Sequence, residues 1–495
     1  MEHNLLIGKY TLESLTSGMY LSPLDLYREY VQNAADAIDK AVKLGYLTPK
    51  AGKIQIDIDS KNHYVKIEDN GCGIADTSAE QELTDIGNSH KDYRESRGFR
   101  GIGRLSGLSY CAHLRFTTTS VGSKTSTAVT FDCKRLKRHL TPLEDDTESI
   151  EDALYDVITV SHKNVDEDSH FFRVEMFDAE NDDGLLERTK VINYLEQTLP
   201  LPFADDFIWG PMIHQRLNGF GVQLPEYNVY LNFDGKDRKL VKPYHNKVSS
   251  DRIRRIEDPI QDIHFETFNI HYKPCAVLWY AETNYYGTII NPSIKGIRKR
   301  HGNIMFGDGN SLREYFKEER FNGWLCGELI FCSDLIVPNA RRDDFEKTNA
   351  YIEVLRQFSE WTTEIAKVIR SKSHQRSKID EKSSKLLEAE TDQPDSEPVI
   401  DEPDLDQLSS TFQSVDELDD EDNSDSLTTM DLFNKLSILT GARQQNVTKY
   451  KALNISSKLT IEQKTIYEKV FDLMYDKLPK NKAEEVVQLM INELT

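Results

Sequence analysis

The sequence predicts an α+β fold in which helices form one layer on an antiparallel sheet in the N-terminal part of the chain. Three observations lead to this fold class. Residues 24–42 repeat apolar side chains at helical spacing, and residues 53–70 alternate apolar and polar side chains. Residues 114–136 contain two strand-like runs around a polar turn.

The first predicted helix carries a polar face beside its apolar stripe. The Ser22–Pro23 pair suits its start, and Gly45 is expected to end it. Glu29, Asn33 and Asp36 are spaced four and then three residues apart, so they fall on one helical face. From the helix alone, this face is either a solvated surface or the wall of a polar site. The apolar stripe consists of Leu24, Tyr27, Val31, Ala35, Ile38 and Val42.

The strands that follow are expected to pair in antiparallel fashion. Residues 53–60 (KIQIDIDS) and 63–70 (HYVKIEDN) are joined by a short polar turn, and their apolar residues recur at every second position. Within residues 114–136, Ser120 to Lys124 is the predicted turn of a second hairpin. Residues 169–180 (SHFFRVEMFDAE) are expected to add a further strand to the same sheet.

The length of 495 residues predicts several compact parts joined by connecting segments. We expect a first domain at residues 1–198 and a mixed α/β middle domain at residues 199–373, which ends in a helix starting near Thr348. An acidic linker is expected at residues 374–426, and a small helical module at residues 427–495. Capping boxes at Thr460/Gln463 and Asn481/Glu484 predict two amphipathic helices in that module.

The net charge of −22 is concentrated in the predicted linker. Residues 380–426 hold 18 acidic residues against two lysines, a balance of −16, which leaves −6 for the rest of the chain. A segment so acidic and so poor in aromatic residues cannot bury enough apolar area to offset the entropy of ordering, so we expect it to be disordered. The overall charge therefore gives no argument for nucleic-acid binding by the remaining parts.

Composition also limits the cellular context. The sequence has no run of about 18 apolar residues that could span a membrane and no signal-like start, so we expect a cytoplasmic protein without a membrane partner. The six cysteines form no CxxC pair and no metal-ligand spacing. We expect them to be reduced thiols that are mostly buried, and we expect no structural zinc.

Two glycine-rich motifs follow the second strand. In EDNGCGI, Gly71 and Gly73 allow a sharp turn after Asp69, which leaves a carboxylate at a strand end where it can accept a hydrogen bond from the amine of a planar ligand. In GFRGIGRLSGL, a glycine-rich run precedes a helical segment, so its backbone N–H groups could bind phosphates. That run contains Gly98, Gly101, Ile102 and Gly103.

The segments REYVQNAADAID, EDNGCGI and GFRGIGRLSGL resemble the three signature motifs of the GHKL ATPases, the superfamily of gyrase, the ninety-kilodalton heat-shock chaperone, histidine kinases and mismatch-repair MutL. The resemblance implies a Bergerat-type α/β sandwich that binds ATP and Mg²⁺. It implies that Asn33 ligates Mg²⁺, that Glu29 orients and deprotonates the attacking water, and that Asp69 binds the adenine amine. Asp36 would brace the site.

A lid segment is implied by the same resemblance. In IGNSHKDY, the residues Asn88, Ser89 and Lys91 resemble the polar groups that close over the nucleotide in this superfamily. The sequence departs from the superfamily pattern at two places. The late strand carries SHFFRVEM where the superfamily often has a Gly-Thr pair, and GFRGIGRL is closer to the mismatch-repair form of the glycine motif than to that of the chaperone.

The second region is similar to the middle domain of the heat-shock chaperone. GELIFCSDLIVPNARRDDFEKTNAYIEVLRQF resembles the stretch in which an arginine reaches the γ-phosphate. Matched residue by residue, Asn339 aligns with the asparagine of that motif, Arg342 with the catalytic arginine and Phe345 with the leucine. Arg341 remains an alternative for the catalytic role. The chaperone's large C-terminal dimerisation domain has no counterpart in the sequence.

These observations favour an ATP-hydrolysing, chaperone-like machine that acts on a protein partner. ATP-dependent pairing of two copies is left open. An alternative is a nucleic-acid-acting GHKL ATPase of the mismatch-repair or MORC type, motivated by the basic segments FDCKRLKRHL and GIRKRHG. A third is a nucleotide-gated scaffold with negligible turnover.

Overall fold

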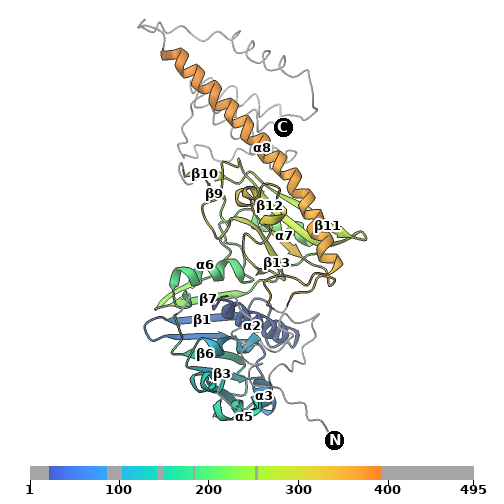
Figure 1. Cartoon of the computed structure of the whole chain (residues 1–495). Helices are drawn as coiled ribbons and strands as arrows, with labels where there is room; N and C mark the ends of the chain where they lie inside the picture. The colour runs from blue at the N-terminus through green and yellow to red at the C-terminus, as the bar shows by residue number, and fades with distance from the viewer. Residues whose placement is uncertain are drawn as a thin grey trace, which may run out of the picture. The chain divides into compact units, whose positions relative to one another are not determined.

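A computed structural model of the chain describes residues 22–85, 103–141, 149–181, 184–250, 255–339 and 341–391 (Figure 1). These residues belong to one compact unit, Met1–Gln393. The predicted lid residues, most of the glycine-rich run, the acidic linker beyond residue 391 and the predicted C-terminal helices lie outside the described residues.

The described elements follow one another in this order. The helices are α2 (Asp25–Lys43), α3 (Asp76–Thr84), α4 (Cys133–His139), α5 (Ile150–Val157), α6 (Arg188–Thr198), α7 (Gly210–Gly219) and α8 (Asn349–Thr391), with short 3-10 helices η1 (Gly103–Ser109), η3 (Arg313–Tyr315) and η4 (Glu319–Trp324). The strands are β1 (Lys53–Asp59), β2 (Tyr64–Asp69), β3 (His113–Thr119), β4 (Thr125–Asp132), β5 (Ile158–Asn164), β6 (Phe171–Phe177), β7 (Asn228–Phe233), β8 (Lys236–Lys239), β9 (Lys247–Ser250), β10 (Ile256–Pro259), β11 (Asp262–Ile270), β12 (Lys273–Glu282), β13 (Gly296–His301), β14 (Ile304–Phe306) and β15 (Cys326–Phe331).

The first sheet has the order β5-β4-β3-β6-β2-β1-β7-β8 within the described residues. Its pairs are antiparallel except β1 with β7, which run parallel. Both predicted hairpins are confirmed, β1 with β2 and β3 with β4, and so is the predicted strand at β6. One difference is that β7 and β8, from residues beyond 198, complete this sheet. Their pairing with β1 is a long-range contact for which local sequence patterns carry no signal.

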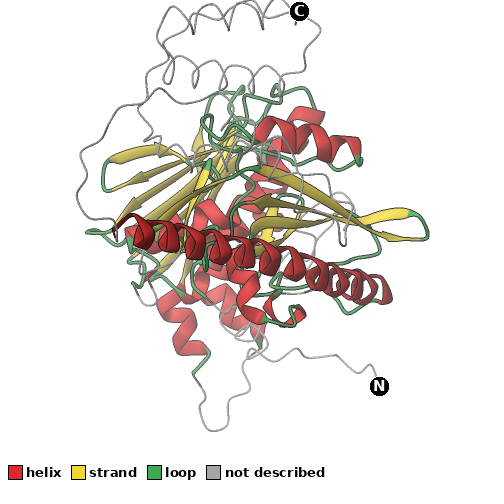
Figure 2. Cartoon of the chain, turned by 90° about the horizontal axis from the view of Figure 1, so that it is seen from above, coloured by secondary structure: helices red, strands yellow, loops and turns green. Residues whose placement is uncertain are grey.

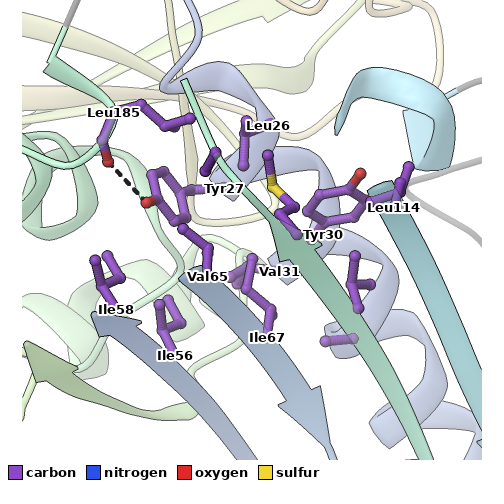
Figure 3. Close-up of a cluster of buried hydrophobic side chains, with 14 of the residues drawn as sticks. Leu26, Tyr27, Tyr30, Val31, Ile56, Ile58, Val65, Ile67, Leu114 and Leu185 are labelled. Carbon is purple, nitrogen blue, oxygen red and sulfur yellow. Dashed lines mark hydrogen bonds between the residues drawn. The ribbon is translucent and has the colours of Figure 1, made fainter. Parts of the chain in front are cut away.

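The core of the first sheet lies between its apolar face and α2. Figure 3 shows Val31 of α2 beside Ile67 of β2, Tyr30 pointing toward Leu114 of β3, and Tyr27 reaching toward Leu185. Each such fully buried side chain contributes about 1.5–3 kcal/mol relative to an exposed one. The tyrosine hydroxyl of Tyr27 donates to the carbonyl of Leu185 at 2.9 Å, so this buried polar group is satisfied. The predicted apolar stripe of α2 therefore faces the sheet.

The ends of α2 lie close to the prediction. The helix begins at Asp25, two residues after Pro23, because Ser22 to Leu24 form a turn in which the Ser22 carbonyl accepts from the Asp25 N–H at 3.0 Å. Gly45 follows the C-cap residue with φ +77°, a conformation that costs glycine little, and its N–H donates to the Val42 carbonyl at 3.1 Å. The prediction that Gly45 ends the helix is confirmed.

The second sheet has the order β11-β12-β15-β13-β14. Strand β12 is buried along most of its length, and its alternate residues belong to two different hydrophobic clusters, so both faces of the sheet are covered. Helix α8 contributes Val354, Phe358 and Ile369 to one cluster, and α7 contributes Ile213 and Leu217 to the other (Figures 1 and 2).

Helix α8 corrects one expectation about the linker. Its start at Asn349 confirms the helix predicted near Thr348, but it continues to Thr391, so residues 374–391 of the predicted disordered linker are helical. The segment contains good helix formers such as Lys, Glu, Leu and Ala, and extending an existing helix avoids the unfavourable nucleation step.

Two further expectations concern thiols and membranes. All six cysteines are free thiols; five are buried and Cys332 is exposed, which confirms the expectation of reduced, mostly buried thiols. Among the described helices, none combines the length and the apolar character needed to cross a bilayer.

Candidate functional site

The polar face of α2 is partly buried rather than solvated. Glu29 is only 4% exposed, while Asn33 and Asp36 are half-buried. The three side chains stand on successive turns of the helix, so they form one wall. Of the two alternatives that the sequence left open, burial favours the wall of a polar site, because a charged residue is rarely this buried without a partner.

Asp69 meets this wall at the end of β2. Its carboxylate is buried, and its Oδ1 accepts a hydrogen bond from the Gly71 N–H at 2.8 Å. The turn after it approaches α2 so closely that a Cβ on Gly71 would lie 2.6 Å from the backbone of Ala37. The next N–H, that of Cys72, donates to the Ala37 carbonyl at 3.0 Å. The first glycine of the motif is thus required for Asp69 to lie beside the helix that carries Asn33 and Asp36.

Gly73 fixes the other side of the same turn. It adopts φ +60°, and a Cβ at this position would lie 1.8 Å from the Thr119 carbonyl oxygen on β3. The following N–H, that of Ile74, donates to the Thr118 hydroxyl at 3.0 Å. Backbone and side-chain contacts therefore fasten the Asp69 turn to α2 on one side and to β3 on the other.

Gly103 connects the end of the glycine-rich run to Glu29. It opens η1, and a Cβ on it would lie 2.5 Å from the Glu29 Oε2 atom. The hydroxyl of Tyr30 holds the same segment, because it donates to the Arg104 carbonyl and accepts from the Gly107 N–H, both at 3.0 Å. A Cβ here would have to displace the Glu29 carboxylate, so the backbone of the motif lies directly against it.

Arg342 reaches this carboxylate from the second sheet. Its Nη1 donates to Glu29 Oε2 at 2.8 Å and also to the Gln32 side-chain oxygen. Arg342 is buried and has φ +56°, an unusual conformation for a residue with a side chain, and such conformations cluster at functional sites. The neighbouring Arg341 side chain is exposed, and only its carbonyl takes part, accepting from Arg28 at 3.0 Å.

The second sheet holds the loop that carries Arg342, residues 338–345, which we call the arginine loop. Pro338 and Phe345 form an antiparallel bridge at its base. Phe345 is buried and stacks on Phe306 of β14, with ring centroids 4.9 Å apart. Lys299 of β13 donates to the Asp344 carboxylate at 2.6 Å. The position of Arg342 is thereby fixed by strands that lie far from α2 in the sequence.

Two residues at this contact had no predicted role. Arg28 is buried, lies 3.4 Å from both Asp25 and Glu29, and donates to the arginine loop. Gln32 is buried and accepts from Arg342. Gln32 lies three residues after Glu29 on α2, so helical spacing was an available signal for it, whereas Arg28 is adjacent to Glu29 and gives no such signal.

The structure thus brings Glu29, Gly103 and Arg342 together. It separately places the turn that carries Asp69, Gly71 and Gly73 between α2 and β3. The candidates Asn88, Ser89, Lys91, Gly98, Gly101 and Ile102 lie outside the described residues. Chemically, the arrangement offers a buried carboxylate base, an oxygen ligand on Asn33, an amine acceptor on Asp69 and a guanidinium that is brought in from elsewhere in the chain.

Residues 27–171 match the family model of the histidine kinase-, DNA gyrase B- and HSP90-like ATPases. This segment supports a GHKL-type ATPase domain and contains all three motifs described above. It covers less than half of the chain and ends before the arginine loop. No curated protein shows significant similarity to the chain.

Proposed function

We propose that the chain is a magnesium-dependent ATPase that works as a chaperone-like conformational machine, in which closure of the second sheet's arginine loop on α2 is coupled to ATP turnover on a protein partner. The observation that carries the proposal is the 2.8 Å contact between Arg342 and Glu29. It joins a candidate base inside the matched ATPase segment to a cation that lies outside it.

The residues present fit ATP and Mg²⁺. Asn33 offers an oxygen atom of the kind that Mg²⁺ prefers, and Asp69 offers a buried acceptor suited to a base amine. Gly103 places no side chain next to the Glu29 carboxylate, which leaves room there for a phosphate-binding turn. Magnesium-bound ATP would supply the phosphoryl group that is attacked.

The chain's own residues then perform three tasks. Glu29 accepts the proton of the attacking water at a carboxylate oxygen, a role worth about 10²–10⁴ in rate. Arg342 can transfer its hydrogen bonds from Glu29 to a phosphate oxygen, and a guanidinium so positioned contributes about 10³–10⁵. That transfer also frees Glu29 to act as a base. During this transfer, Arg28 holds the arginine loop beside α2, and Gln32 holds the Arg342 side chain.

The nucleic-acid alternative loses one of the two basic segments that motivated it, while the other stays exposed and includes Arg138. In GIRKRHG, the side chains of Arg298, Lys299 and Arg300 are buried inside the second sheet. In FDCKRLKRHL, Lys134, Arg135 and Lys137 are exposed, but each is paired with an acidic residue, Asp178, Asp156 and Glu180 respectively. A protein partner remains the better supported proposal.

The test compares two adjacent arginines in a phosphate-release assay. Arg342→Ala should slow ATP hydrolysis by about 10³-fold or more with little loss of nucleotide affinity, because the guanidinium acts mainly on the transition state. Arg341→Ala is the matched control and should hydrolyse ATP at close to the wild-type rate, since its side chain is exposed. Equal rates in both variants would reject the role of Arg342. Absence of hydrolysis in the wild type would leave the scaffold alternative.

A further inference from the structure

The inference concerns a chain of contacts that leads from α6 to the arginine loop. The hydroxyl of Tyr194 on α6 donates to the Asp25 Oδ1 atom at 2.8 Å. The same oxygen lies 3.4 Å from the Nη1 atom of Arg28, one turn further along α2. The Nη2 atom of Arg28 donates in turn to the Arg341 carbonyl at 3.0 Å. Three consecutive contacts thus join α6 to the residue that precedes Arg342.

The last of these contacts fixes the peptide group on which the conformation of Arg342 depends. The carbonyl of that peptide accepts from Arg28, and its N–H, which belongs to Arg342, donates to the Asn339 carbonyl at 3.3 Å. Arg342 has φ +56°, a sparsely populated conformation for a residue with a side chain, and such a conformation persists only where its surroundings hold it. Because the peptide is bound through both its carbonyl and its N–H, Arg28 helps to keep the Arg342 guanidinium directed toward Glu29.

Asp25 and Tyr194 decide which way the Arg28 guanidinium turns. Glu29 offers a second carboxylate at 3.4 Å, so Arg28 has two anionic partners on its own helix. The Arg28 side chain is only 5% exposed, so water competes little for these contacts. Burial raises the pKa of Tyr194 well above its usual value of 10, so its hydroxyl stays a hydrogen-bond donor at neutral pH. That hydroxyl holds the Asp25 carboxylate in the position from which it binds Arg28.

Helix α6 can anchor this chain of contacts because it also binds the second sheet. Gln197 lies three residues after Tyr194 and is therefore its neighbour on the helix surface. The Gln197 carbonyl accepts from Arg300 at 2.8 Å, and its side-chain oxygen accepts from Arg298 at 3.4 Å. Both arginines belong to β13 and are fully buried. The same helix thus binds the first turn of α2 and the sheet that carries the arginine loop.

We propose that Tyr194 and Asp25 are positioning residues for ATP hydrolysis, which hold Arg28 against the arginine loop and thereby keep Arg342 directed toward the phosphate. The inference rests on the proposed function. The two residues act through Arg28 and Arg342 and not by touching the nucleotide. Their removal should lower kcat and leave nucleotide affinity unchanged, because the Arg342 guanidinium acts mainly on the transition state.

The experiment measures phosphate release and Mg-ADP affinity with the full chain. Tyr194→Phe removes one hydroxyl and keeps the ring. Loss of a hydrogen bond to a charged group corresponds to about 10–150-fold, and only part of this reaches Arg342 through two further contacts, so kcat should fall by about 3–30-fold. The dissociation constant of Mg-ADP, measured by isothermal titration, should be unchanged. Asp25→Asn removes the charge that holds Arg28 and should lower kcat in the same way.

Tyr27→Phe is the matched control. Tyr27 is also a buried tyrosine, and its hydroxyl donates to the Leu185 carbonyl at 2.9 Å, which takes no part in the chain of contacts. The variant should lower the midpoint of urea denaturation, because a buried hydrogen bond is lost, but its kcat should equal that of the wild type. A kcat in Tyr194→Phe equal to that of Tyr27→Phe would overturn the inference.

A double-mutant cycle shows whether the effect passes through Arg342. In the Arg342→Ala background, Tyr194→Phe should leave the residual kcat unchanged, because the guanidinium that Tyr194 positions is gone. An equal fall of kcat in both backgrounds would mean that Tyr194 acts on the fold alone, and the positioning role would be wrong. If Tyr194→Phe does not fold, Asp25→Asn carries the same cycle.

The outcomes also separate this inference from the proposed function. If Arg342→Ala slows hydrolysis and Tyr194→Phe does not, only the positioning role is overturned. If Arg342→Ala hydrolyses ATP at the wild-type rate, or if the wild type does not hydrolyse ATP, the proposed function fails and the positioning role fails with it.

Discussion

Glu29 and Glu328 are both buried carboxylates between two cations, but their partners are anchored differently. Glu29 is held by Arg28 from its own helix and by Arg342 from the arginine loop. Glu328 on β15 lies 2.7 Å from Lys242 and 2.5 Å from Arg300 of the adjacent strand β13, and it also accepts from Tyr244 and Trp279. Burial alone would raise the pKa of Glu328, but Arg300 and Lys242 outweigh it and lower the pKa to about 2.

The difference shows when a buried charge is structural and when it is exchangeable. The partners of Glu328 come from the packed second sheet and its neighbours, so releasing one would disrupt the core. The Arg342 partner of Glu29 comes from a single loop, and under the proposed function Arg342 exchanges the Glu29 carboxylate for a phosphate oxygen. We therefore expect substitutions at Glu328 to act on stability, and substitutions at Glu29 to act on turnover.

The largest expected effect is on turnover at Glu29. Glu29→Gln keeps an acceptor for Arg342 but cannot take up a proton at neutral pH, so steady-state hydrolysis should fall by about 10²–10⁴-fold. Nucleotide affinity should change little, and the midpoint of thermal unfolding should fall less than in Glu328→Gln, because Arg28 keeps Asp25 as a counter-charge. A Glu29→Gln variant that loses stability but keeps its rate of ATP hydrolysis would show that Glu29, like Glu328, is a structural carboxylate. The distinction between the two residues would then be wrong.

Glu328→Gln should instead destabilise the fold. The amide preserves shape but leaves Arg300 and Lys242 buried without a counter-charge, which typically costs about 3–5 kcal/mol. Urea denaturation followed by fluorescence measures this loss. Glu318→Gln is the matched control, because Glu318 also lies between two arginines, Arg320 and Arg370, but at the surface, where solvent screening should make the loss much smaller. Equal losses in the two variants would contradict the distinction between buried and exposed pairs.

Asp69→Asn sharpens the comparison further, because its partner is a ligand rather than a side chain. A hydrogen bond to a charged group contributes about 1.5–3 kcal/mol, so ATP affinity should weaken by about 10–150-fold. Isothermal titration gives the affinity, and phosphate release at saturating ATP should stay near the wild-type rate. An unchanged affinity would remove Asp69 from the base pocket.

The sequence predicted those parts of the site that depend on local spacing. The α2 face and the turn after Asp69 follow from residues close together in the chain. The burial of GIRKRHG did not follow, because Arg300 and Lys299 depend on Glu328 and Asp344, which lie outside the segment. Likewise, the parallel pairing of β1 with β7 joins segments that no local pattern connects. Charge-rich strands look exposed until their distant partners are known.

The smallest expected effect lies at the surface contact between α8 and β12. Glu282 of β12 is hydrogen-bonded by His264 and paired with Lys372 of α8. The hydrogen bond from His264, opposed by burial and aided by Lys372, lowers the pKa of Glu282 to about 2, and the hydrogen bond to Glu282 raises the pKa of His264 above 6.5. The contribution of Glu282 to the free energy of unfolding is therefore lost as pH falls below its unfolded pKa of 4.5. The contribution of His264 to the same free energy is lost as pH rises through its folded pKa.

This cluster should stabilise the fold most between about pH 4.5 and 6.5, which are the unshifted pKa values of the two groups. Because His264 is 40% exposed, solvent screening limits the gain to about 0.2–1 kcal/mol. Urea denaturation at pH 5.5 and pH 8.5 measures it, with His264→Gln as the variant that should lose this part of the pH dependence. If the variant keeps the full difference in stability between pH 5.5 and pH 8.5, other groups titrate in this range. The surface pair then contributes nothing measurable to stability, unlike either buried carboxylate.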